Sequence, residues 1–183
     1  MIEFIRIINE LKYLLIIAIG LQILPFIFNT FFKFDFKKWK HNNKIITADK
    51  VILKVKSFDG EFKNQRILSY LRKIDPYVFE ELILNCFELK GLKVIRNKSY
   101  SGDGGLDGMV IETKKKFLIQ AKRYSNSIKT SHIEDFSTLI FNTNADGGYF
   151  IHTGKTSVKA YDNYRNSNIK IISGQKLIDF IIT

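Results

Sequence analysis

The twenty residues Tyr13–Phe32 contain no charged side chain, and this run limits what the chain can fold into more than any other feature. A helix of this length spans about 30 Å, the thickness of the hydrocarbon core of a bilayer. A buried core helix would normally show a polar face within this length. A cleaved signal peptide would be shorter and would end at a small-residue site. We therefore expect a transmembrane helix over about residues 13–32, within a membrane anchor formed by residues 1–32.

The charges that flank the run predict its orientation. Two basic and two acidic residues precede it, whereas residues 33–73 contain twelve Lys and Arg against four Asp and Glu, a net charge of +8. Because positively charged flanks stay on the cytoplasmic side, we expect a single-pass protein with its C-terminal domain in the cytoplasm. We interpret residues 33–73 as a basic juxtamembrane linker that contacts anionic lipid headgroups. DNA binding by the same lysines remains an alternative.

Two patterns within residues 33–73 predict secondary structure. The segment Lys50–Lys56 alternates enough between apolar and polar residues to indicate a short strand, and Glu61–Arg72 has apolar residues at helical spacing. A further helix should begin at Asp75 and Pro76, a capping residue followed by proline at the first helical position, and end near Lys90. Its apolar stripe should face the core and includes the only cysteine, Cys86, as a buried hydrophobe.

The remaining residues alternate between strand and helix patterns. The expected elements are strands 92–96, 106–112 and 116–122, helix 130–142, strand 149–153, helix 157–165, strand 169–172 and helix 174–181. Three strands in succession, followed by alternating helices and strands, predict an α/β sandwich with a mixed central sheet. This domain should occupy residues 74–183.

Polar side chains come together on the second and third of these strands. Asp107 follows a glycine-rich turn, and Gln120 and Lys122 share one face of strand 116–122 because side chains alternate along a strand. Carboxylate and amide oxygens suit a hard cation such as Mg²⁺ or Mn²⁺, and the main-chain carbonyl of Ala121 could add a third ligand. Lys122, on the same face as Gln120, would add a positive charge beside the metal.

Each of these residues also has a plainer interpretation. Asp107 could stabilise a turn, and Gln120 and Lys122 could lie on a solvated strand face. Asp103 could join a second metal ion, although a turn-forming Asp-Gly pair accounts for it as well.

The strings GDGGLDG (Gly102–Gly108) and QAKRY (Gln120–Tyr124) resemble the Mrr-type branch of the PD-(D/E)xK nucleases. The resemblance covers about residues 74–180 and implies a restriction-endonuclease-like sandwich that cleaves DNA with a divalent metal. It implies a catalytic carboxylate in the first helix, where the family has a Phe-Glu pair, and so indicates Glu80. Neighbouring helical residues point about 100° apart, so only one of Glu80 and Glu81 can face the site. Gln120 replaces the acidic residue that is commoner in the wider superfamily.

We therefore expect a membrane-tethered, metal-dependent DNA endonuclease with Glu80, Asp107, Gln120 and Lys122 as site residues, of which Asp107 and Gln120 bind the metal. Type IV-like restriction of modified or foreign DNA is the role that the resemblance implies. A structure-specific junction nuclease and a non-catalytic, membrane-anchored nucleic-acid-binding module on the same fold are the alternatives. A homodimer is an open alternative to a monomer.

Overall fold

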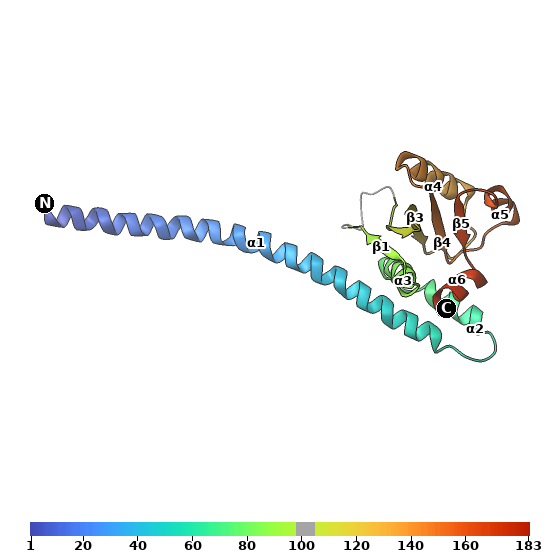
Figure 1. Ribbon diagram of the computed structural model, residues 1–183. Helices are drawn as coiled ribbons and strands as arrows, with labels where there is room; N and C mark the ends of the chain where they lie inside the picture. The colour runs from blue at the N-terminus through green and yellow to red at the C-terminus, as the bar shows by residue number, and fades with distance from the viewer. Residues whose placement is uncertain (98–104) are drawn as a thin grey trace. The chain divides into compact units, whose positions relative to one another are not determined.

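The computed structural model describes residues 1–97 and 105–183, leaving aside the side chains of residues 2, 5 and 31–37. Contacts divide the chain into two compact units, Met1–Asn43 and Lys44–Thr183. Helix α1 (Ile2–Lys56) forms the first unit and continues into the second (Figure 1). Its segment Arg6–Thr30 is apolar and long enough to cross a membrane, and none of the window that meets this test is buried. A signal sequence near the N-terminus would meet the same test.

The last turns of α1 correct one prediction. Residues Lys50–Lys56, expected as a strand, are helical. The buried side chains here are spaced by three and four residues and lie on one helical face: Ala48, Val51, Ile52 and Val55. A seven-residue window of Val, Ile, Leu and Lys is compatible with the spacing of a strand or of a helix. Packing in the folded protein therefore decided that these residues are helical. The segment that the sequence led us to interpret as a linker thus contributes part of the core.

Two helices follow. Helix α2 (Lys63–Leu71) buries Ile67 and Leu71. Helix α3 (Pro76–Leu89) begins after Asp75, whose Oδ1 accepts hydrogen bonds from two backbone N–H groups of the first turn at 2.9 and 3.2 Å. The predicted cap is therefore confirmed, and it fixes where the first turn of α3 starts.

The central sheet is mixed, as expected. Its strands, which lie side by side in chain order, are β1 (Lys93–Arg96), β2 (Gly108–Glu112), β3 (Lys115–Lys122), β4 (Gly147–His152) and β5 (Ile169–Ile172). The first three strands pair antiparallel, and β3, β4 and β5 pair parallel. The other helices are α4 (Thr130–Asn142), α5 (Val158–Tyr164) and α6 (Gln175–Ile182). From α2 onward, the bounds differ from the predicted ones by at most two residues.

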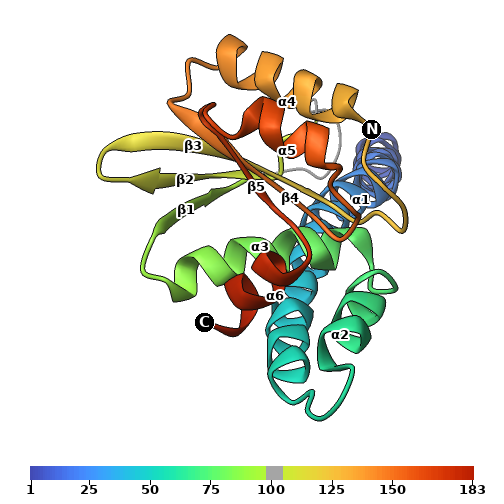
Figure 2. The same ribbon diagram turned by 90° about the vertical axis from the view of Figure 1, so that its right-hand side faces the viewer.

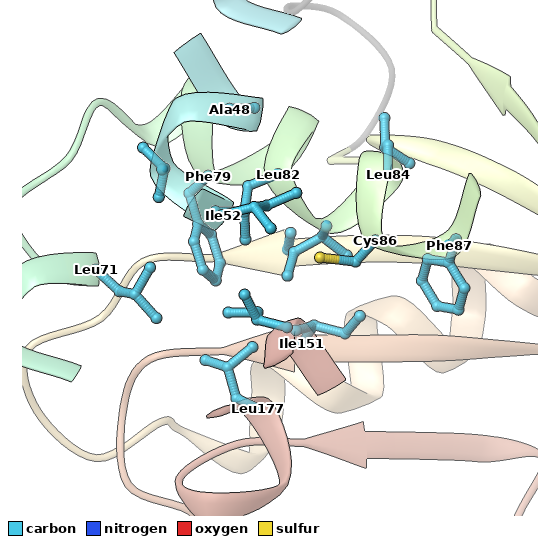
Figure 3. Close-up of a cluster of buried hydrophobic side chains, with 14 of the residues drawn as sticks. Ala48, Ile52, Leu71, Phe79, Leu82, Leu84, Cys86, Phe87, Ile151 and Leu177 are labelled. Atoms are coloured by element: carbon cyan, nitrogen blue, oxygen red, sulfur yellow. The ribbon is translucent and has the colours of Figure 1, made fainter. Parts of the chain in front are cut away.

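Helices cover both faces of the sheet (Figure 2). On one face α4 and α5 pack over a cluster that includes Leu118, Phe136 and Phe150. On the other face α3, α6, α2 and the end of α1 enclose the larger cluster (Figure 3), which includes Cys86. Burial raises the pKa of the Cys86 thiol to about 12, so this residue behaves as a small hydrophobe, as predicted.

Candidate active site

Asp107 is held in place by the strand next to its own. It lies directly before β2, and its N–H donates to the carbonyl of Ile119 at 3.0 Å. Its Oδ2 accepts a hydrogen bond of 2.6 Å from the N–H of Ala121. The ladder between β2 and β3 ends with Gly108 paired to Ile119, so Ala121 lies beyond the last pair. In an extended strand the carbonyl of a residue points to the same side as its N–H. The Ala121 carbonyl therefore points to the Asp107 side, as a third metal ligand would require.

Gly105 makes room for the other two side chains. Its φ is +88°, and a Cβ atom there would lie 2.5 Å from Gln120 Nε2 and 3.6 Å from Lys122 Nζ. Gln120 Nε2 donates to the Gly105 carbonyl at 2.8 Å, which directs the amide oxygen away from that glycine. Only glycine combines this backbone conformation with so close an approach. Residues 101–104 of the glycine-rich stretch, including Asp103, lie outside the described residues.

Glu80 joins this group from α3. Burial raises the pKa of Glu80 to about 8; the charge of Asp107 raises it too, whereas Lys122 lowers it. The structure therefore brings Glu80, Asp107 and Lys122 close enough for their charges to interact. Gln120 joins them through its place beside Gly105 and Lys122.

Asp107 is the stronger acid of the two carboxyl groups. Burial raises its pKa to about 6 and the charge of Glu81 raises it too, whereas the hydrogen bond from Ala121 and the charge of Lys122 both lower it. Asp107 therefore ionises before Glu80, and its negative charge then opposes ionisation of the second group. At neutral pH Asp107 is therefore mostly ionised, whereas Glu80 mostly keeps its proton.

The neighbouring carboxylate, Glu81, is directed elsewhere. It is 1% exposed, and its Oε2 accepts a hydrogen bond of 2.9 Å from Arg96 Nε at the end of β1. The same guanidinium also bonds Glu88 and donates to Asn85 at 2.6 Å. The charge of Glu81 still raises the pKa of Asp107, so both carboxylates of α3 interact with Asp107 and the choice of Glu80 stays a prediction. Sequence analysis did not identify Arg96. Its partner Glu81 lies 15 residues earlier in the chain, and no local pattern links an arginine at the end of a short strand to a helix at that separation.

The donors present suit a hard divalent cation. Within residues 1–97 and 105–183, no three His, Cys, Asp or Glu side chains come together in a way that could hold a metal ion. The possible ligands are instead the Asp107 carboxylate, the Gln120 amide oxygen and the Ala121 carbonyl, with the Glu80 carboxylate nearby. Oxygen-only donor sets of this kind suit Mg²⁺, which retains several waters. A cation would also favour the ionised forms of both carboxyl groups, whose pKa values are raised mainly by burial.

His152 is an unpredicted neighbour of the site. It pairs with Lys122 across β3 and β4 and is fully buried. Burial lowers the pKa of His152 to about 4, so the ring is neutral at physiological pH. Its Nε2 lies 3.0 Å from the hydroxyl of Thr156, which in turn lies 2.8 Å from that of Ser173. These contacts tie the ends of β4 and β5 together beside Lys122.

Comparison with known proteins agrees with the fold. A family model described as a restriction endonuclease, Mrr_cat, matches residues 71–181. The type IV methyl-directed restriction enzyme EcoKMrr of Escherichia coli (strain K12) is 26% identical over 124 residues, which cover 63% of this chain and 41% of that enzyme. Among solved structures, the MspJI restriction endonuclease in complex with a 27-mer oligonucleotide aligns with a TM-score of 0.51 and 19% identity, over 67% of this chain and 32% of that one. This chain thus spans less than half the length of either protein, and the structural likeness shows a shared fold.

Proposed function

The chain belongs to the Mrr-type restriction endonuclease family, and from this membership we propose that it is a membrane-tethered, metal-dependent DNA endonuclease. The observation that carries the proposal is the meeting of Glu80, Asp107, Gln120 and Lys122 at one end of the sheet. Two acids with raised pKa values, an amide and a lysine beside an oxygen-rich cradle are the groups that phosphodiester hydrolysis needs.

Each residue has a distinct role in this proposal. Asp107, Gln120 and the Ala121 carbonyl would hold Mg²⁺ or Mn²⁺, which would polarise a phosphoryl oxygen and activate water. Lys122 would place its ammonium against the attacked phosphate, where negative charge grows in the transition state. Glu80, whose pKa is about 8, would accept a proton from the attacking water or complete the metal shell once it is ionised.

The substrate class follows from the relatives. The Escherichia coli relative is methyl-directed by description, and the structural neighbour is bound to an oligonucleotide. We propose type IV-like restriction of modified or foreign DNA. We propose that DNA structure or a partner contributes to the choice of substrate.

The nuclease proposal is tested by cleavage. The full chain, purified in a neutral detergent, should nick or cut plasmid DNA when Mg²⁺ or Mn²⁺ is added and should be inactive in EDTA. Methylated, unmethylated and branched DNA should be compared side by side. Binding to all three substrates without cleavage would favour the alternative, a non-catalytic nucleic-acid-binding module on a nuclease fold. Preference for branched DNA would favour a junction nuclease.

The tether proposal rests on the apolar segment of α1. Its large side chains are exposed to an extent that soluble proteins avoid, for example 65% for Leu15 and 64% for Ile16. The lysine-rich segment after it favours a cytoplasmic C-terminal domain. The full chain should therefore pellet with membranes and resist carbonate extraction, and a C-terminal tag should be protected from external protease. Recovery of the chain in the soluble fraction would contradict the tether.

A further inference from the structure

A hollow of about 660 Å³ lies along the outer strand of the sheet, on the opposite edge from β1. Residues of α5, β5 and α6 line it, and these helices flank β5 in Figure 2. We call it the β5 groove. Its aromatic and polar lining residues are Tyr161, Tyr164, Arg165, Ser167, Lys170 and Lys176.

The lining of the β5 groove is positively charged. Three of its nine residues are basic, and none of the nine carries a carboxylate. Lys170 is partly neutralised, because its Nζ lies 3.7 Å from Glu112. Arg165 is exposed, and Lys176 Nζ lies 4.4 Å from the centre of the Tyr161 ring. Two tyrosine rings beside two available cations resemble a surface on which bases stack while phosphates are neutralised.

Charge argues against other occupants. A second copy of this chain would bring the same cations to the groove, and the chain as a whole has a net charge of +11. Addition of a peptide strand to the edge of β5 is disfavoured, because β5 has only four residues and carries Lys170, a type of residue that protects edges from pairing. A polyanion with flat rings is the occupant that matches both the charge and the tyrosines.

The groove also leads toward the proposed active site. Lys122 pairs with His152, and Ile151 pairs with Ile172, so the carboxyl ends of β3, β4 and β5 lie level with one another. With strands about 4.8 Å apart, the end of β5 lies about 10 Å from the strand that carries Lys122. A nucleic-acid strand lying along β5 would therefore end close to the proposed site.

We propose that the β5 groove binds a single nucleic-acid strand, with bases on Tyr161 and Tyr164 and phosphates on Arg165 and Lys176. This inference rests on the proposed function, since it supplies the path by which the substrate is held. It assigns binding to an edge of the sheet that the proposed metal site does not use.

Binding of a fluorescein-labelled oligothymidylate of about 12 nucleotides tests the groove. The full chain carrying Asp107→Ala is used in neutral detergent with EDTA, so that no cleavage occurs. Arg165→Glu should weaken binding on the order of tenfold, and Tyr161→Leu should do the same because it removes a stacking ring. Tyr161→Phe, which keeps the ring, should bind like the parent.

Lys159→Glu is the matched control for Arg165→Glu. Lys159 is exposed on the same helix but does not line the groove, and the change in charge is equal. Equal losses for the two variants, or a parent that does not bind the probe, would overturn the inference. Displacement of the probe by a glutamate-rich peptide at lower concentration than by unlabelled oligothymidylate would overturn it in favour of a protein partner. Groove-dependent binding without any plasmid cleavage would instead leave the groove standing and contradict the nuclease.

Discussion

The two parts of helix α1 place similar residues in opposite surroundings. In the unit Met1–Asn43, apolar side chains such as Ile16 are 64% exposed, whereas Ile52 and Val55 in the second unit are 4% and 0% exposed. The exposed part is the more hydrophobic one. The number of apolar residues in a helix therefore indicates how much of its surface must be kept from water. The spacing of those residues indicates whether the helix can bury that surface against the rest of the protein.

The second part of α1, which follows Asn43, is rich in lysine and yet buries one face, because its apolar residues recur at helical spacing. Lys50, Lys54 and Lys56 are exposed, whereas Lys44 is largely buried beside Asp75. The four buried residues at helical spacing join the core beneath α3. The first part has no such stripe, and its apolar residues surround the helix. We propose that a lipid bilayer surrounds the apolar surface of this first part.

The largest expected effect is on the rate of DNA cleavage, which should depend on residues of the second unit and not on the first part of α1. Lys122→Ala should lower the rate of DNA cleavage on the order of 10², since one preorganised donor stabilises a transition state by about 3 kcal/mol. DNA affinity measured in Ca²⁺ should fall much less, because Lys122 would be one of many basic side chains near the DNA phosphates. Asp107→Ala should abolish cleavage. The control, Ile16→Ala in the first part, should cut at the parental rate. Parental cleavage by Lys122→Ala would mean that Lys122 takes no part in the reaction.

The next effect is on the free energy of unfolding and compares the same substitution, Ile to Ala, at two positions of α1. Ile52→Ala should lower the free energy of unfolding by about 2–4 kcal/mol, because it removes a buried side chain and leaves a cavity. Ile16→Ala, measured in the same detergent, should change it by less than about 0.5 kcal/mol. Urea denaturation followed by circular dichroism gives both values. Equal losses would show that the two parts of α1 are packed alike.

A smaller effect concerns pH and belongs to the second unit alone. The folded-state pKa of Glu80 is raised from 4.5 to about 8, so the folded state holds a proton that the unfolded state has released. Stability should therefore fall as pH rises from about 4.5 to 8 in EDTA. Glu80→Gln should remove part of this slope and stabilise the protein at pH 8 by about 1 kcal/mol, a value reduced for the partial exposure of Glu80. Thermal melts at several pH values measure both. A stability that rises over this range would contradict the assignment.

The smallest effect is expected from Asp107→Ala on stability. Loss of the hydrogen bond to Ala121 and relief of buried negative charge oppose each other, so the thermal midpoint should stay nearly unchanged or rise. Differential scanning calorimetry in EDTA would measure it. A loss of several kcal/mol would identify Asp107 as a structural cap instead.

Local patterns in the sequence determined most of the fold. The cap at Asp75, the apolar stripe of α3 and the succession of strands and helices along the chain each depend on residues within a few positions of one another, and all are confirmed. Alternation along β3 also determined that Gln120 and Lys122 share a face. Such short-range rules operate before any tertiary contact exists.

Tertiary structure decided the rest, because burial and charge depend on residues far apart in the chain. Packing against α3 made residues 50–56 helical. Arg96, on another element, pairs with Glu81, while the placement of α3 brought Glu80 close enough to Asp107 for their charges to interact. The raised pKa values of Glu80 and Asp107 arise from desolvation, which no sequence window contains. The β5 groove likewise exists only because α5, β5 and α6 meet at one edge of the sheet.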